Sequence, residues 1–291
     1  MQLQSKKLVL EFTKMSGTGN DFIVIDNRFY HFSGQELSEM AKKMCRRRLD
    51  VGADGLLALG NPVSEGSHYR MSYYNADGSL GTMCGNGARC LALYAWDAGV
   101  QADLLRFDSD AGLYSATVNR SEGVVRLFVP APKSYHPEFK MGIAGSKNAV
   151  EEVAGIGLGL CHYIWTGTEH LVVEVADVHR IDVPLLGKQL RFDTALQPTG
   201  ANVNFIAPQT PRSINVRTFE KGVEAETLAC GTGSLAAALV GFDRGMVTEQ
   251  PVTIHMPGGD LRVGWEGEAS QPTSLFLEGE VTVVYRATTE V

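Results

Sequence analysis

YYNADGSLGTMCGNGARCLALYA, residues 73–95, has a counterpart half a chain away in RTFEKGVEAETLACGTGSLAAAL, residues 217–239. Each stretch reads as a strand, a polar turn and a Cys-Gly-x-Gly sequence that opens a helix of small residues. Cys84 and Cys230 stand 146 positions apart in a chain of 291 residues. Because the repeats of solenoid proteins span only about 20–50 residues, a period this long predicts two similar domains.

A weaker repeat supports the same division of the chain. SGTGNDFIVID (16–26) is echoed by WTGTEHLVVEV (165–175), again about half a chain later. The proline-rich break at 130–132 predicts a boundary, with a first half over 1–130 and a second over 131–274. The pattern leaves open whether 275–291 joins the first half. Alternating strand and helix signals predict an α/β fold of the α+β type.

The secondary structure is expected to place both cysteines at helix starts. Ser33 and Glu36 form a capping box that predicts a helix with a buried apolar face. Two further helices are expected to begin at Gly85 and Gly231, each packed as core against a sheet. Strands are expected over 22–26, 69–75, 124–129, 171–175, 203–207, 214–219, 252–256 and 281–285.

Composition excludes several classes of protein. A hydrophobic fraction of 44% argues against disorder, and a net charge of −7 disfavours a nucleic-acid partner. No apolar run approaches the roughly 18 residues of a membrane span. Glu11 interrupts the N-terminal apolar stretch, so no signal peptide is expected. Five cysteines without CxxC spacing then predict a cytoplasmic protein with neither disulfides nor a metal site.

Two cysteines at helix N-termini suggest a specific chemistry. Unpaired backbone N–H groups and the helix dipole favour a thiolate there, and they also favour a bound carboxylate. If the two halves face each other, both thiols converge on one cleft. One thiol could then remove a proton from one face of a carbon while the other delivers a proton to the opposite face. Inversion of an amino-acid α-carbon needs such a pair, so the expected partner is a small-molecule amino-acid substrate.

MCGNGARC, ETLACGTG, SGTGNDF and NADGS together resemble the motifs of the diaminopimelate epimerases, in that family's order, from Lys14 to about Pro257. The resemblance implies two pseudo-symmetric domains, each a mixed sheet wrapped on a central helix, with the active site in the cleft between them. It also implies cofactor-independent epimerisation of LL-2,6-diaminopimelate to meso-diaminopimelate by two cysteines, in lysine and peptidoglycan-precursor synthesis.

The resemblance carries over to individual residues. Cys84 and Cys230 match the acid/base pair, and His170 and Glu220 match the residues thought to adjust the two thiol pKa values. The substrate-binding set that it implies is Asn20, Asn75, Gly85, Asn86, Thr168, Asn202, Glu220, Lys221, Gly231 and Thr232. Asp21 and Asp77 are interpreted as turn formers, and Cys45, Cys90 and Cys161 as small buried hydrophobic residues.

Three positions depart from the family pattern. Thr168 and Glu169 stand where the family has Asn or Ser, then Pro, and Lys221 stands where it commonly has arginine. Lysine cannot grip a carboxylate in bidentate fashion, so the distal end of the substrate could be held differently here. The turn before Cys230 is also one residue longer than in many members.

Other functions remain open from the sequence. A racemase or epimerase of another amino acid would use the same cysteine pair, and the proline racemases also pair two cysteine turns. A non-catalytic binding module and a cysteine hydrolase are the more distant alternatives. No cofactor is implied, because the chain lacks a GxxxxGK[ST] loop and GTGNDF lacks the third glycine of the dinucleotide fingerprint. A homodimer is left open.

Overall fold

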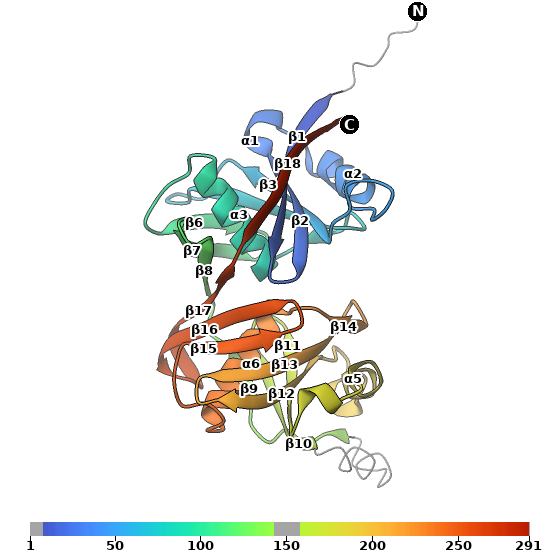
Figure 1. The fold of residues 1–291 in the computed structure, drawn as a ribbon, viewed down its shortest axis with the longest axis vertical. Helices are drawn as coiled ribbons and strands as arrows, with labels where there is room; N and C mark the ends of the chain where they lie inside the picture. The colour runs from blue at the N-terminus through green and yellow to red at the C-terminus, as the bar shows by residue number, and fades with distance from the viewer. Residues whose placement is uncertain (1–7, 143–157, 291) are drawn as a thin grey trace, which may run out of the picture. The chain divides into compact units, whose positions relative to one another are not determined.

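The computed structural model describes residues 8–142 and 158–290, which form two compact units (Figure 1). One unit comprises Met1–Leu127 with Gly279–Val291, and the other comprises Phe128–Glu278. The N-terminal stretch considered for a leader lies partly outside the described residues, since 1–7 are not among them. No helix among the described residues is both long and apolar enough to cross a membrane.

The first unit contains three α-helices and most of the strands that precede residue 130. Its elements are β1 (Val9–Gly17), β2 (Asn20–Asp26), α1 (Asn27–Tyr30), α2 (Gly34–Met44), β3 (Gly55–Gly60), β4 (Tyr69–Asn75), β5 (Leu80–Gly81), α3 (Gly85–Asp97), β6 (Leu105–Ser109), β7 (Gly112–Asn119), β8 (Val124–Val129) and β18 (Thr282–Glu290). β8 continues across the boundary between the units.

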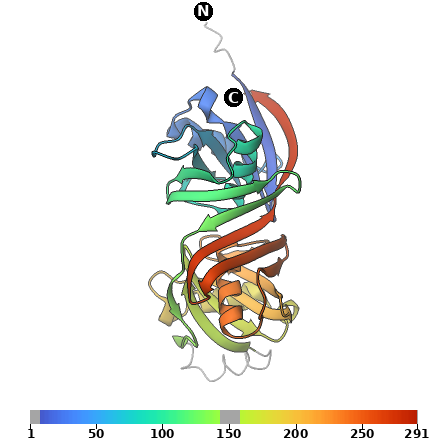
Figure 2. The same ribbon diagram turned by 90° about the vertical axis from the view of Figure 1, so that its left-hand side faces the viewer.

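The strands of the first unit form a mixed sheet around α3. They pair in the order β18–β1–β2–β3–β4–β6–β7, with β2/β3 and β4/β6 parallel and the other pairs antiparallel. Figure 2 shows β18 running beside β1 along nearly its whole length. The α3 helix contacts β1, β2, β3, β4 and β7. Most of its residues are buried, so α3 is the centre of this unit.

The second unit repeats this series of elements. They are β9 (Lys133–His136), β10 (Leu158–Trp165), β11 (Glu169–Val175), η2 (Val178–Arg180), α5 (Val183–Arg191), η3 (Thr194–Leu196), β12 (Asn202–Thr210), β13 (Ser213–Glu220), β14 (Ala225–Thr227), α6 (Gly231–Asp243), β15 (Val252–Met256), β16 (Gly259–Glu268) and β17 (Gln271–Glu280).

The strand pairing of the second unit matches that of the first. It runs β9–β10–β11–β12–β13–β15–β16–β17, with β11/β12 and β13/β15 parallel and the rest antiparallel. The α6 helix contacts six of these strands and carries buried residues on all sides. A helix that is apolar all round belongs in a core. The predicted fold class, a mixed sheet wrapped on a central helix in each of two similar units, is confirmed.

Candidate active site

Cys84 is the residue that starts α3. Its extended backbone ends the preceding loop, and its Sγ accepts a hydrogen bond from the N–H of Gly87 at 3.5 Å. The first intrahelical bond runs from Ala88 N to Cys84 O. The N–H groups of Gly85 and Asn86 therefore have no acceptor within the helix, as at every helix start. A half-buried sulfur and two such N–H groups lie together at this turn.

Cys230 starts α6 in the same way. Gly233 N donates to its Sγ at 3.4 Å, and Thr232 Oγ1 lies 3.5 Å from the same sulfur. Thr166 Oγ1 donates to the Thr232 carbonyl and so ties the turn between β10 and β11 to the helix start. Cys230 is buried, with 6% of its surface exposed. The predicted helix starts at Gly85 and Gly231 are both confirmed.

The register of the strands brings the predicted residues of the first unit to neighbouring strand ends on one side of the sheet. Phe22 pairs with Gly55, and Gly55 pairs with Asn75, so the start of β2 and the end of β4 flank the start of β3. Asn20 begins β2 and joins these strand ends to α3 by accepting a hydrogen bond from Asn86 Nδ2 at 2.8 Å. Asn20 and Asn86 therefore lie together at the start of α3, whereas Asn75 ends β4 and donates to Ser79 Oγ at 3.0 Å.

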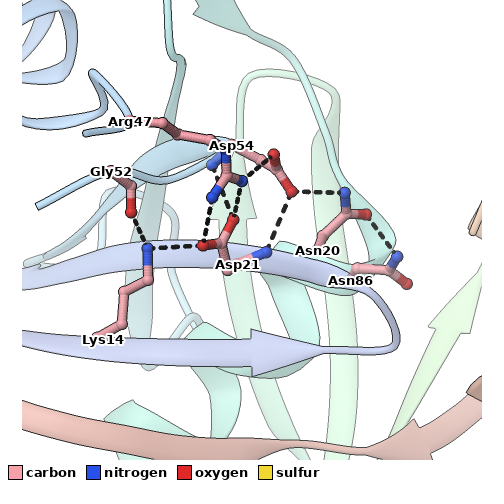
Figure 3. A network of polar contacts seen from close by, with 7 residues as sticks. All are labelled: Lys14, Asn20, Asp21, Arg47, Gly52, Asp54 and Asn86. Atoms are coloured by element: carbon pink, nitrogen blue, oxygen red, sulfur yellow. Dashed lines mark hydrogen bonds and ion pairs between the residues drawn. The ribbon is translucent and has the colours of Figure 1, made fainter. Parts of the chain in front are cut away.

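A chain of side-chain hydrogen bonds orients the amides of Asn20 and Asn86, and Figure 3 shows the part of it that runs from Asn86 through Asn20 to Asp54. Arg89 Nη2 donates to Asn86 Oδ1 at 2.6 Å, Asn86 Nδ2 to Asn20 Oδ1, and Asn20 Nδ2 to Asp54 Oδ2 at 2.9 Å. A guanidinium only donates and a carboxylate only accepts, so the two ends allow one orientation of each amide. Each NH2 group keeps a second hydrogen beyond these bonds.

Arg89 places a fully buried guanidinium next to this turn. It donates to neutral oxygens, those of Asn86, Thr18 and the Glu280 carbonyl. Burial lowers the pKa of Arg89 to about 10, while Cys90 and Cys84 act in the opposite direction. The guanidinium is thus still charged at neutral pH, and it attracts negative charge on the Cys84 sulfur.

Asp21 is part of an ion-pair network, which corrects its interpretation as a turn former. Its carboxylate lies 2.8 Å from Lys14 Nζ and accepts from Arg47 at 2.5 Å, as Figure 3 shows. Burial alone would raise the pKa of Asp21, but hydrogen bonds from Arg47 and Lys14 lower it to about 2. Asp77, by contrast, does form a turn, because its Oδ1 accepts from the backbone and hydroxyl of Ser79.

In the second unit the predicted residues lie at the corresponding strand ends. His170 pairs with Asn202 at the start of two parallel strands, and the next position, Val203, pairs with Phe219 just before Glu220. Asn202 Oδ1 accepts from the backbone N–H of Lys221 at 2.8 Å. The starts of β11 and β12, the end of β13 and the start of α6 thus come together.

His170 is completely buried and neutral. Its Nδ1 lies 3.0 Å from Asn204 Nδ2, and its Nε2 has no hydrogen-bond partner among the described residues. Burial and the nearby charge of Lys221 together lower the pKa of His170 to about 3, whereas the charge of Glu169 acts in the opposite direction. An imidazole with this pKa carries no charge at neutral pH.

This low pKa predicts a pH-dependent loss of stability. In the unfolded chain the histidine takes up a proton near pH 6.5, whereas the folded protein resists protonation until about pH 3. The free energy of unfolding should therefore fall as pH drops below about 6.5, by up to about 1.4 kcal/mol per pH unit from this residue. Denaturant titrations between pH 7.5 and 5 should give a steeper decline for wild type than for His170→Gln. Parallel curves would contradict the assignment.

Glu220 lies at the end of β13, close to the turn that leads to Cys230. Burial raises the pKa of its carboxyl group, and the Thr227 side chain acts in the opposite direction. A carboxyl group with a raised pKa can keep its proton closer to neutral pH than an exposed glutamate can. Glu220 is therefore not the solvated surface charge that a strand end usually carries.

The positions that depart from the family pattern contact one another. Lys221 Nζ lies 2.5 Å from Glu169 Oε2, and Thr168 Oγ1 donates to the same oxygen at 3.0 Å. Burial would raise the pKa of Glu169, but the hydrogen bond from Lys221 lowers it below its usual value. Both side chains are about three-quarters buried. A paired cation and anion therefore stand beside Asn202.

The other cysteines lack the setting of Cys84 and Cys230. Cys45 and Cys90 are buried, as predicted, and burial raises the pKa of each to about 12. Cys161 is half-buried rather than buried, and burial raises its pKa to about 11. Each thiol is therefore protonated at neutral pH. In the part of the chain that the structure describes, no cluster of three His, Cys, Asp or Glu side chains could hold a metal.

Sequence reasoning missed Asp54, Arg89 and Asn204. Arg89 stands in the CGNGAR motif that was used for the cysteine, but its burial is a property of the packed helix. Asp54 precedes a strand, where acidic residues commonly mark a turn. Asn204 alternates with buried residues in NVNF, and a polar residue inside an apolar strand was the available signal.

Comparison with known proteins places the chain among characterised sequences. It matches the family described as Diaminopimelate epimerase over residues 12–128 and 162–284. It is 37% identical over 284 residues to the diaminopimelate epimerase of Aquifex aeolicus, covering 95% of this chain and 96% of the relative. It is 41% identical over 278 residues to that of Chlorobaculum tepidum, covering 94% and 99%.

Solved structures share the fold at low sequence identity. A PhzF-family phenazine biosynthesis protein from Bacillus anthracis superposes with a TM-score of 0.72 at 16% identity, covering 98% of this chain and 100% of that one. A hydroxyproline epimerase from Agrobacterium vitis, solved with trans-4-hydroxy-L-proline, gives 0.64 at 12% identity, covering 99% and 94%. These likenesses support the two-unit fold.

Proposed function

The chain belongs to the diaminopimelate epimerase family, as its motifs predict, and is an amino-acid epimerase; from that premise we propose that Cys84 and Cys230 epimerise LL-2,6-diaminopimelate to meso-diaminopimelate without a cofactor. One sulfur, as thiolate, removes the α-proton from one face of the carbon. The other, as thiol, delivers a proton to the opposite face. Roles exchange for the reverse reaction, so the pair titrates as a coupled system.

The observation that carries this proposal is the matching cap geometry at Cys84 and Cys230. In each turn the sulfur accepts the N–H three residues on, and two further N–H groups stand at the helix start. Such donors stabilise a thiolate, and they stabilise the negative charge that builds up on the substrate's α-carboxylate as the proton leaves. Gly85, Asn86, Gly231 and Thr232 would supply these contacts.

His170 and Glu220 would adjust the two thiols by different means. Because His170 is neutral, it can stabilise a thiolate only by donating a hydrogen bond from its ring N–H, with no charge to add to that effect. Glu220, with its raised pKa, can share a proton with a neighbouring acid or base near neutral pH. Asn20, Asn75 and Asn202 would orient the substrate with amide groups that the surrounding hydrogen bonds hold in place.

The proposal implies that Lys221 binds the distal carboxylate of the substrate. Lys221→Met should then raise KM for diaminopimelate by about 10-fold or more, because a hydrogen bond between charged groups contributes about 1.5–3 kcal/mol. The kcat should change much less, since Lys221 is far along the substrate from the reacting carbon. Lys221→Arg is the matched control: it keeps the positive charge and adds a bidentate grip on a carboxylate, so KM should stay at or below the wild-type value. A fall in kcat without a rise in KM would contradict this role.

The decisive experiment is an assay of LL-diaminopimelate in heavy water with cofactor-stripped protein. The product should be meso-diaminopimelate with solvent deuterium at the inverted carbon. Inversion without deuterium uptake would falsify the two-cysteine scheme. Activity on plain L-amino acids in place of diaminopimelate would favour the alternative, a racemase of another amino acid that uses the same cysteine pair.

The same proposal sets the protein in lysine and peptidoglycan-precursor synthesis, with a small-molecule amino-acid substrate as its partner and neither nucleic acid nor membrane. Because the reaction needs two reduced thiols, we place the protein in the cytoplasm, where thiols stay reduced.

A further inference from the structure

Asn204 connects the buried histidine to the second cysteine turn. Its side chain is fully buried on β12. Its Nδ2 contacts His170 Nδ1 at 3.0 Å and the Leu171 carbonyl at 3.3 Å. Its Oδ1 accepts from Thr218 Oγ1 at 3.0 Å. The same oxygen lies where a β-carbon on Gly233 would sit, so the amide also packs against the turn that caps Cys230.

These contacts determine which way the amide points. A backbone carbonyl can only accept a hydrogen bond, so the Asn204 atom that faces Leu171 must be the NH2 nitrogen. The Thr218 hydroxyl can donate or accept and agrees with either orientation. Turning the amide over would press two oxygens together at Leu171 and remove a hydrogen bond from a buried site, which costs about 1–3 kcal/mol.

The amide orientation in turn determines the tautomer of His170. Because the same NH2 group faces Nδ1, that ring nitrogen must accept, and the single proton of the neutral imidazole must be on Nε2. A proton on Nδ1 would point at the amide hydrogens. A doubly protonated ring would do the same, and the charge of Lys221 would also repel it, although the charge of Glu169 attracts it.

The consequence is a buried hydrogen-bond donor that has no acceptor. Nε2–H has no hydrogen-bond partner among the described residues, although its surroundings exclude water. A donor in this position is costly unless an acceptor arrives with the reaction. Building on the function proposed above, we propose that Asn204 is a positioning residue that fixes His170 as the Nε2–H tautomer, so that the imidazole donates a hydrogen bond to an anion at the reacting centre.

The test reads the tautomer directly, without substrate. In protein labelled with 15N-histidine, two-bond 1H–15N correlations distinguish protonated from unprotonated ring nitrogens, and His170→Gln assigns the signals. At pH 7 wild type should show Nδ1 unprotonated and Nε2 protonated. In Asn204→Asp the carboxylate can only accept, so Nδ1 should become protonated. Thr218→Val removes one hydroxyl from the same amide and should leave the tautomer unchanged, because Leu171 still orients the amide.

Kinetics separate positioning from folding. Asn204→Asp should lower kcat for epimerisation by at least ~10-fold, with a smaller change in KM, since the lost donor acts on the reacting groups. A wild-type signal for protonated Nδ1 overturns the inference, and so does an Asn204→Asp protein that keeps Nδ1 unprotonated. The wild-type spectrum decides the matter even if the variant does not fold. If the tautomer is as expected but diaminopimelate is not a substrate, the proposed function fails and the assignment of the tautomer stands.

Discussion

Replacing either Cys84 or Cys230 by alanine should reduce kcat for the conversion of LL- to meso-diaminopimelate by about 10³-fold or more, since a positioned acid or base contributes about 10²–10⁴-fold. Both variants should lose a similar fraction of kcat, because inversion needs a proton donor and a proton acceptor on opposite faces of the carbon. One remaining thiol can exchange a proton on its own face but cannot invert the carbon. The measurement is meso product formed per enzyme, together with deuterium uptake into unreacted LL substrate.

Cys161→Ala is the matched control for these variants. Cys161 has a half-buried thiol whose pKa burial raises to about 11, and it lies on β10 rather than at a helix start. Its removal should leave kcat within about twofold of wild type, because it shares none of the cap geometry that favours a thiolate. If Cys84→Ala or Cys230→Ala retained comparable activity, the two-cysteine mechanism would be wrong.

Gly233→Ala should impair both stability and turnover. A β-carbon at this position would overlap Asn204 Oδ1 and lie 3.3 Å from the Cβ and Sγ atoms of Cys230. Asn204 is held by Leu171 and Thr218, so it cannot withdraw without losing hydrogen bonds. Overpacking of this kind costs about 1–3 kcal/mol of unfolding free energy. Since the same shift moves the Cys230 turn, we expect kcat to fall by roughly 10-fold or more.

Gly87→Ala in α3 provides the comparison within the same molecule. Gly87 occupies the equivalent third position after Cys84, but there an added β-carbon would meet the side chains of Leu57 at 3.2 Å and Phe22 at 3.4 Å. Side-chain ends can move by a few tenths of an ångström, so Gly87→Ala should be the milder variant. Thermal melts and kcat values for the two proteins measure the difference. Equal effects would show that the Asn204 contact does not limit the second turn.

Local signals explain how much of the fold was predictable. The helix starts at Gly85 and Gly231 and the strands over Tyr69–Asn75 and Val252–Met256 follow from caps and periodicity within a few residues. Strands such as β16 were not predicted, because GDLRVGWEGE shows only a short alternation of three apolar residues, Leu261, Val263 and Trp265, among glycines and charges. That segment becomes a strand through its pairing with β15 and β17, which no local pattern encodes.

By itself the sequence determined that two cysteines each begin a buried helix, since a Cys-Gly-x-Gly cap and a run of small apolar residues act over one or two turns. It also pointed to the family through the order of those motifs. The tertiary structure alone decided how the surrounding polar groups are oriented. Asn20 meets Asp54 across 34 positions, and Asn204 meets His170 across another 34. Such bonds exist only once strand register has closed those loops, so a tautomer or an amide orientation cannot be deduced before the sheet is assembled.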